Sequence, residues 1–299
     1  MDILTVRGLK KSFRDKRVLC GLDLSVPEHS VFGFIGKNGA GKTTTMKAIL
    51  GLFPVDAGEI TVCGERVCYG ETETNRHVGY LPDVPEFYGF MTSREYLALC
   101  GECLGMERSA IRSRTDELLT LVGLANETHR IKGFSRGMKQ RLGIAQALFG
   151  RPKLLICDEP TSALDPIGRK EILDILSAAK TQTTVLFSTH ILSDVERICT
   201  DAAFLKDGRI VLGGKITELK GLCSTEEFTV AFRDPHDAAR FASVFPQAKR
   251  QSEDTLVVTG DATTMHAVLQ YLAQAPTSLC RLERNEASLE SLFLEVASS

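Results

Sequence analysis

The feature that most constrains this chain is a glycine-rich turn at residues 36–43, with the sequence Gly-Lys-Asn-Gly-Ala-Gly-Lys-Thr. The turn follows an almost wholly apolar run, residues 31–35, and opens a helical pattern over 43–50 that stops at Gly51. Glycines at this spacing let backbone N–H groups surround a polyphosphate, and the positive end of the next helix attracts its charge. The sequence therefore predicts a phosphate-binding loop between a buried strand and a helix.

Two side chains of this loop have specific expected roles. Lys42 would reach the β and γ phosphates of a nucleotide, and the Thr43 hydroxyl would ligate Mg²⁺. The residues expected to contact the nucleotide here are Gly36, Lys37, Asn38, Gly39, Ala40, Gly41, Lys42, Thr43 and Thr44. A chance glycine turn is the alternative, but the strand before it and the helix after it favour the phosphate loop.

A second apolar run, residues 154–157, ends in two carboxylates, Asp158 and Glu159. Alone, two acids at a strand end would indicate only a solvated turn. Together with a phosphate loop they predict that Asp158 orients Mg²⁺ and its water shell. Glu159 would then take the proton from the water that attacks the γ-phosphate.

The remaining pattern predicts an α/β chain with distinct domains. Short strands near the N-terminus give way to helical spacing over 93–149, and apolar strands separated by a helix then return at 154–157 and 184–188, which indicates a βαβ layer with a parallel sheet. Residues 213–214 and 220–221 look like the exit to a linker. Beyond it the pattern runs strand, helix, two strands, helix, strand, with 6 basic and 11 acidic side chains.

Composition excludes several classes of function. With 36 Lys and Arg against 38 Asp and Glu, the chain does not bind nucleic acid through bulk basicity. Its longest stretch without charged residues, 262–280, is interrupted by polar residues and cannot span a membrane. The N-terminus lacks the pattern of a signal peptide, so we expect the chain in the cytoplasm.

Nine cysteines, an odd number, fit reduced thiols in that compartment. Cys100 and Cys103 form a C-x-x-C pair, and Cys63 and Cys68 are further candidates for a zinc site. Because the sequence around the pair has helical spacing, we interpret Cys100 and Cys103 as packed neighbours on one helix rather than metal ligands.

The segment 134–138, Phe-Ser-Arg-Gly-Met, lies before the second carboxylate motif and resembles the L-S-G-G-Q signature of the nucleotide-binding domains of ABC transporters. Ser135 can cap the helix that follows. Ser135 and Gly137 can offer hydroxyl and N–H groups to a γ-phosphate that belongs to another subunit. The resemblance adds Met138 to these nucleotide contacts. An ordinary helix start with a basic face is the alternative.

Other positions match this family in order. Phe13 occupies the place of the aromatic residue that stacks on adenine. Residues 162–165, ending in Asp165, resemble the loop that crosses the dimer interface, and residues 188–190, ending in His190, resemble the switch that touches the γ-phosphate. Asp83 stands where the family usually has a Gln that contacts the metal and the attacking water. An aspartate can still ligate Mg²⁺ or hold a water there.

The resemblance implies a P-loop NTPase core of the ABC type over 1–221. It would have an antiparallel β subdomain and a helical subdomain at about 84–150, followed by a small C-terminal α+β accessory or dimerisation domain over 222–299. It implies an ATPase that binds ATP and Mg²⁺, pairs with a second copy of itself and drives export through a separate membrane permease, at the cytoplasmic face of the membrane and without nucleic acid. The alternatives are a soluble ABC-type ATPase of translation or DNA repair, and an importer subunit.

Two further predictions concern surfaces. The apolar and aromatic segment 84–91 is expected to form part of a groove for a short helix of the permease, with packing inside the chain as the alternative. The C-terminal domain is expected to strengthen subunit pairing or regulate it, with a passive extension as the alternative. The residues expected to form its helical core stripes are Ala238, Phe241, Ala242, Phe245, Met265, Val268, Leu269 and Leu272, and a capped amphipathic turn is expected at Ser288, Leu289, Leu292 and Phe293.

Overall fold

The computed structural model describes residues 1–70, 73–222, 227–285, 289–290 and 292. The chain divides into two compact units, Met1–Ile216 and Thr217–Ser299. The predicted linker exit is wrong in detail. Gly213 and Gly214 continue strand β10 (Arg209–Lys215), where they pair with β9, and helix α7 (Ile216–Leu222) follows without a break.

The centre of the first unit is a six-stranded sheet with the order β10-β9-β3-β8-β7-β6. Its strands besides β10 are β3 (Val31–Gly36), β6 (Val78–Leu81), β7 (Leu154–Cys157), β8 (Thr184–Thr189) and β9 (Asp201–Lys206). All pairs are parallel except β9 with β10. Every residue of β3, β7 and β8 is buried, as the apolar runs predict for strands covered on both faces.

A second, antiparallel sheet packs within the same unit in the order β2-β1-β4-β5. Its strands are β1 (Asp2–Phe13), β2 (Lys16–Pro27), β4 (Ala57–Val62) and β5 (Glu65–Arg66). Buried residues such as Leu4, Leu22 and Ile60 join the hydrophobic core that also contains Phe34 and Ile156 of the central sheet. The expected mixed α/β fold with an antiparallel part is confirmed.

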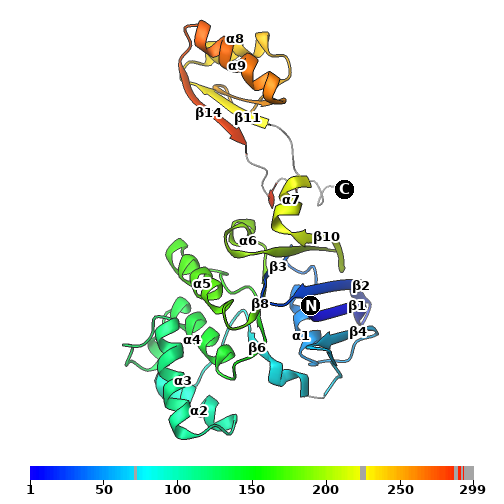
Figure 1. The fold of residues 1–299 in the computed structure, drawn as a ribbon, viewed down its shortest axis with the longest axis vertical. Coiled ribbons are helices and arrows are strands. Elements are labelled where there is room, and N and C mark those ends of the chain that lie inside the picture. Colours follow the sequence, from blue (N-terminus) through cyan, green and yellow to red (C-terminus); the bar gives the residue numbers. More distant parts are fainter. Residues whose placement is uncertain (71–72, 223–226, 286–288, 291, 293–299) are drawn as a thin grey trace. The chain divides into compact units, whose positions relative to one another are not determined.

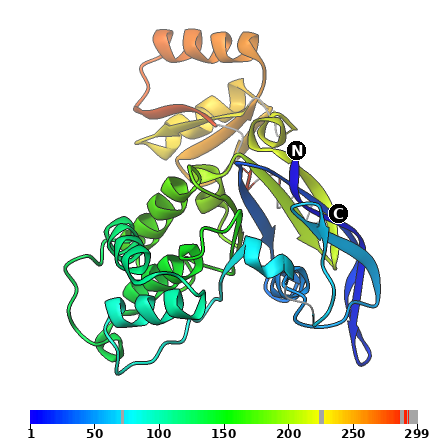
Figure 2. The same cartoon turned by 60° about the horizontal axis from the view of Figure 1, so that its bottom comes forward.

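The first five helices of the first unit follow the predicted pattern, whereas the sixth, at Leu192–Ile198, was not predicted. They are α1 (Lys42–Ile49), α2 (Ser93–Cys103), α3 (Arg108–Leu121), α4 (Arg136–Leu148), α5 (Pro166–Ala179) and α6 (Leu192–Ile198), with short 3₁₀ turns η1 (Glu73–His77) and η2 (Ile131–Gly133). Thr92 and Glu95 form a capping box that starts α2. Within this unit, α2, α3 and α4 lie on one side of the central sheet and the antiparallel sheet on the other (Figures 1 and 2).

Cys100 and Cys103 lie on α2 as free thiols, one helical turn apart. Burial raises the pKa of the Cys100 thiol to about 11, so this thiol is protonated at neutral pH.

The second unit has the predicted order of strands and helices. Its sheet runs β12-β13-β11-β14, with β11 (Glu227–Phe232), β12 (Ala248–Arg250), β13 (Thr255–Thr259), β14 (Leu279–Asn285), and helices α8 (Pro235–Val244) and α9 (Ala262–Gln274). Strand β11 alternates, with Phe228, Val230 and Phe232 buried in a core shared with both helices. The sheet is thus covered on one face.

Most of the predicted core stripe is confirmed. Ala238, Phe241, Phe245 and Val268 are buried, and Ala242, Met265 and Leu272 pack against that core. Leu269 is a correction, because it is 47% exposed: α9 turns only a narrow stripe to the sheet, and Leu269 lies at its edge. Of the predicted C-terminal turn, Leu289 and Leu292 are buried, whereas Ser288 and Phe293 lie outside the described residues.

Across the described ranges, no helix combines the length and the apolar character needed to cross a lipid bilayer.

Candidate nucleotide-binding site

The predicted chemical groups gather at one edge of the central sheet. Parallel strands β3, β8, β7 and β6 are neighbours, so their carboxyl ends lie side by side. The phosphate loop leaves β3, His190 follows β8, Asp158 and Glu159 follow β7, and Asp83 lies two residues after β6. Residues far apart in sequence therefore meet because each follows a buried strand.

The phosphate loop leads into α1 as predicted. Gly41 lies before the first helical residue with φ +114°, and no side chain caps the N–H groups of the first turn. The positive φ favours glycine there, and a Cβ at Gly41 would also lie 2.9 Å from the Leu19 side chain and 3.2 Å from the Val18 carbonyl oxygen, so its neighbours would have to shift. The uncapped helix start leaves N–H groups available for an anion.

Lys42 and the second acid of β7 form the polar centre of the site. The Lys42 Nζ donates to the Gly36 carbonyl at 2.7 Å. It also lies 3.0 Å from Glu159 Oε1, and the two side chains are only 5% and 13% exposed. Glu159 has φ +49°, a left-handed conformation that is unfavourable for residues other than glycine. Its other oxygen, Oε2, lies 2.9 Å from His190 Nδ1. Glu159 thus joins the lysine of the loop to the predicted switch histidine.

Ser188 ties the two acids of β7 to β8, a role that sequence analysis did not assign. Its hydroxyl donates to Asp158 Oδ1 at 2.7 Å and accepts the Glu159 backbone N–H at 2.9 Å. Ser188 and Asp158 are buried. The hydroxyl thus fixes the carboxylate of one acid and the backbone of the other.

Asp83 is held through its backbone more firmly than through its side chain. Its carbonyl accepts 2.7 Å from Nε2 of the buried Gln140. Its carboxylate lies 3.4 Å from Arg136, and both side chains are about half exposed, so this ion pair is weak. Burial raises the pKa of the Asp83 carboxyl, and the charges of Asp158 and Glu159 add to this while Arg136 opposes it.

A cavity of about 440 Å³ lies over this edge of the sheet. The predicted residues that line it are Asn38, Gly39, Gly41, Lys42, Thr43, Thr44, Asp83, Glu159 and His190, and Lys16, Val18 and Ser162 join them. Asp158 is buried and is absent from the lining. Phe13 is also absent from it, but Phe13 pairs in register with the lining residue Lys16 and is 46% exposed. Phe13 therefore lies next to the lining of the cavity, at its rim.

The signature-like residues lie elsewhere. Ser135 caps α4, accepting the Met138 N–H at 3.2 Å, as predicted. Asp165 caps α5 by accepting the Gly168 N–H. Ser135, Gly137, Met138 and Asp165 do not line the cavity above the phosphate loop.

The donor set fits a magnesium nucleotide. The uncapped helix start and Lys42 supply positive partners for phosphates. The Thr43 hydroxyl and the Asp83 carboxylate line the same cavity, with Asp158 buried beneath, and oxygen ligands of this kind suit Mg²⁺. These residues would hold ATP and its metal.

Comparison with known proteins agrees with this geometry. A family model described as ABC transporter matches residues 19–162. YxlF of Bacillus subtilis strain 168, an uncharacterized ABC transporter ATP-binding protein, is 35% identical over 297 residues, which cover 98% of this chain and 99% of YxlF. BcrA of Bacillus licheniformis, a bacitracin transport ATP-binding protein, is 39% identical over 212 residues, which cover 70% of this chain and 68% of BcrA. A solved ATP-binding subunit of an ABC transporter matches with a TM-score of 0.66 at 32% identity, covering 74% of this chain and 92% of that one.

The chain belongs to the ABC transporter family, as an ATP-binding subunit. Such subunits bind and hydrolyse ATP, so the chain is an ATPase. Subunits of this family work in pairs with transmembrane permease partners, and they associate with the membrane through those partners.

Proposed function

We propose that this chain is the ATPase subunit of an exporter and works as a head-to-tail homodimer. One observation supports the dimer most strongly: Ser135 and Gly137 do not line the cavity above the phosphate loop of their own chain. Each ATP would then lie between residues 36–43 of one subunit and residues 135–138 of the other.

Space around the signature-like segment supports this arrangement. A Cβ at Gly137 would meet only the Leu164 side chain, at 3.9 Å, so packing inside the chain does not require a glycine there. Close approach of a second molecule would require one. Ile167, two residues after the predicted interface loop at 162–165, is 70% exposed. An apolar side chain this open beside the predicted interface loop fits burial in a dimer.

In the proposed reaction, Lys42 binds the β and γ phosphates, and Glu159 accepts the proton of the attacking water. Mg²⁺, when bound, neutralises charge on the phosphates. Because His190 Nδ1 lies 2.9 Å from Glu159 Oε2, His190 orients the base that Ser188 fixes through its backbone. Phe13, at the rim of the cavity, stacks on the adenine ring of ATP.

The substitution Glu159→Gln tests the dimer. It keeps the size of the side chain but removes the base, so ATP should bind, hydrolysis should slow by orders of magnitude and the dimer should accumulate. Light scattering with ATP and Mg²⁺ measures the mass. A variant that binds ATP but stays monomeric in complex with its permease would contradict the proposal.

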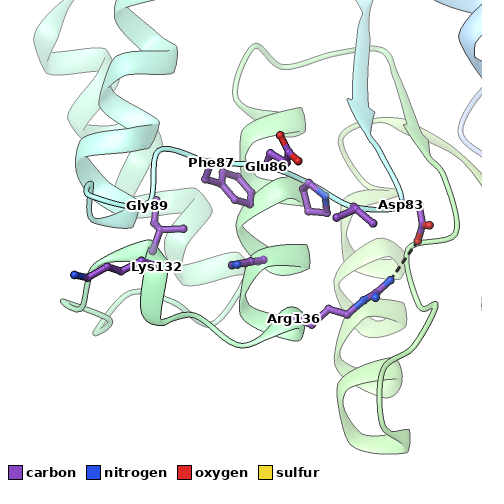
Figure 3. Close-up of a pocket in the computed structure, with 10 residues that line it drawn as sticks. Asp83, Glu86, Phe87, Gly89, Lys132 and Arg136 are labelled. Atoms are coloured by element: carbon purple, nitrogen blue, oxygen red, sulfur yellow. Dashed lines mark hydrogen bonds and ion pairs between the residues drawn. The ribbon is translucent and has the colours of Figure 1, made fainter.

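We propose a groove beside Asp83 as the permease contact. It has a volume of about 460 Å³ and is lined by Val84, Pro85, Phe87 and Ile131 together with Lys132, Arg136, Lys139, Asp83, Glu86 and Gly89. In Figure 3, Glu86 and Phe87 lie on the segment after Asp83, and Lys132 and Arg136 lie across from them. Val84 and Phe90 are 62% and 64% exposed, which leaves apolar surface for a short helix of the permease.

Val84→Glu places a charge on this surface and should abolish transport while the ATPase activity of the isolated subunit persists. Leu104→Glu is the matched control, because Leu104 is 56% exposed but does not line the groove. Transport that survives in Val84→Glu would place the contact elsewhere.

Export by a separate permease at the cytoplasmic face of the membrane is the direction we propose. The 39% identity to a bacitracin transport ATP-binding protein supports a role in transport, and export is the direction that the resemblance of the sequence implies. Co-purification from detergent-solubilised membranes tests it: a polytopic partner is expected, whereas ribosomes or DNA without such a partner would favour a soluble ATPase. Transport assays in vesicles then separate export from import.

For the C-terminal part, residues 222–299, we propose a role in subunit pairing or its regulation. Its core of aromatic and aliphatic residues is its own. Truncation after Gly221 should leave ATP binding intact and lower dimer stability or coupled turnover. Loss of nucleotide binding in a folded truncation would contradict the assignment.

A further inference from the structure

Two side chains, Phe53 and Lys11, contact the ring of Phe13 beside the nucleotide cavity, and Asp56 holds Lys11. We name Lys11, Phe53 and Asp56 the clamp. The Phe53 ring meets the Phe13 ring edge to face, with centroids 5.6 Å apart and planes at 77°. The Lys11 Nζ lies 5.2 Å from the centroid of Phe13 and 5.4 Å from that of Phe53. Both arrangements are attractive for aromatic rings.

Lys11 is itself fixed. It is only 8% exposed, and its Nζ donates to the Pro54 carbonyl at 2.6 Å and lies 3.3 Å from Asp56 Oδ1. The other oxygen of Asp56 accepts the Ser12 N–H at 2.6 Å, and this bond is the main cause that lowers the pKa of the Asp56 carboxyl. Strand β1 is thus tied, just before Phe13, to the loop that carries Phe53.

That loop follows helix α1, the helix that begins at the phosphate loop. Helix α1 starts at Lys42 and ends at Ile49, and Phe53 follows four residues later. Backbone bonds hold the connection, with the Gly51 N–H donating to Ala48 and the Leu52 N–H donating to Lys47. The clamp therefore sets the position of Phe13 relative to the helix whose N-terminus would bind the phosphates.

We propose that Phe53, with Lys11 and Asp56, is a positioning residue that holds Phe13 as a preorganised platform for the nucleotide base. The inference rests on the proposed role of Phe13 and names the residues that make that role effective. Phe13 lies beside a hairpin turn and is half exposed, so without the clamp its ring would have to be ordered each time a base binds.

The test compares ligands with and without a base. Binding of ADP and of inorganic pyrophosphate, each with Mg²⁺, is measured by calorimetry on the full chain. Phe53→Ala should weaken ADP binding about two- to ten-fold, the cost of ordering one side chain, and leave pyrophosphate unchanged. Phe13→Ala should weaken ADP by about five- to a hundred-fold through lost stacking. In steady-state assays Phe53→Ala should raise KM for ATP without lowering kcat.

Three further variants guard against a merely structural effect. Phe53→Leu keeps the apolar bulk and should show a smaller effect of the same kind. Leu52→Ala changes the neighbouring residue, which is 56% exposed, and should bind both ligands normally. The double variant Phe13→Ala/Phe53→Ala should bind ADP no more weakly than Phe13→Ala alone, because Phe53 acts through Phe13.

Each other outcome overturns a specific part. Equal loss of ADP and pyrophosphate in Phe53→Ala would mean that the phosphate loop itself was disturbed. An additive loss in the double variant would mean that Phe53 acts independently of Phe13. ADP binding unaffected by Phe13→Ala would remove the base platform from the proposed function, and the clamp with it. If Phe13→Ala weakens ADP binding as expected but Phe53→Ala does not, the clamp is rejected and the role of Phe13 stands.

Discussion

Replacement of Ser188 by alanine removes the hydroxyl that joins the two acids of the site. That hydroxyl donates to Asp158 at 2.7 Å and accepts the Glu159 N–H at 2.9 Å. The alanine side chain fits the same space, so the fold should persist. What is lost is a hydrogen bond to a charged group and the partner of a part-buried backbone N–H.

The magnitude follows from these two losses. A hydrogen bond to a charged group contributes about 1.5–3 kcal/mol. If that energy is needed in the transition state, where the geometry of Asp158 and Glu159 matters most, kcat should fall by about 10- to 150-fold. KM for ATP should change little, because Lys42 and the phosphate loop do not contact Ser188 in any of the bonds described above.

Ser30→Ala is the matched control. Like Ser188, Ser30 is buried, and it lies one residue before strand β3 of the central sheet. Its hydroxyl donates to the Pro27 carbonyl at 2.7 Å, away from the two acids. Both variants should lower the free energy of unfolding by about 1–3 kcal/mol, but only Ser188→Ala should lose turnover. Equal kcat values for the two variants in steady-state ATPase assays would refute the role given to Ser188.

Two other predictions concern the second unit. Phe241→Ala removes a buried ring in contact with three others, at a cost of about 3–5 kcal/mol. Because a unit of about 80 residues has a stability of only about 4–12 kcal/mol, limited proteolysis should digest this unit of the variant while ATP binding persists, and resistance equal to that of the wild-type chain would contradict this. Hydrogen bonds from Ser278 and an ion pair with Arg240 lower the pKa of Asp237 from 3.8 to about 2, so its stabilisation is present above about pH 4 and is lost as the pH falls to about 2. The difference in Tm between the wild-type chain and Asp237→Asn should shrink over that range; a constant difference would exclude this linkage.

Local pattern was sufficient to predict the parts of the site that follow from one strand and one turn. The run before Gly36 and the helix after Thr43 predict the phosphate loop, and the apolar run before Asp158 predicts a buried strand ending in acids. The alternation in β11 and the stripes of α8 and α9 likewise predict the second unit. In each case burial of one face determines the structure.

The role of Ser188 could not be predicted from local pattern, because it depends on pairing between strands that are distant in the sequence. Cys157 lies opposite Phe187 in the β7–β8 register, which brings Asp158 beside Ser188, and no local pattern encodes that register. The glycines at 213 and 214 indicated a break, but their backbone groups pair with β9, so ladder hydrogen bonds prevailed over glycine's weak strand preference. The clamp around Phe13 could not be predicted from local pattern either, because it joins β1 to a loop more than 40 residues away in the sequence.

The composite site between two subunits is the central claim, and mixing two inactive variants tests it directly. Lys42→Ala removes the lysine of the phosphate loop, and Gly137→Asp places an anionic side chain in the signature-like segment. Either variant alone should be inactive. A mixed dimer has one intact site, formed by the loop of one chain and the signature of the other, so an equimolar mixture should recover about a quarter of wild-type turnover at most. A mixture as inactive as its components, although native mass spectrometry shows mixed dimers, would contradict the shared site.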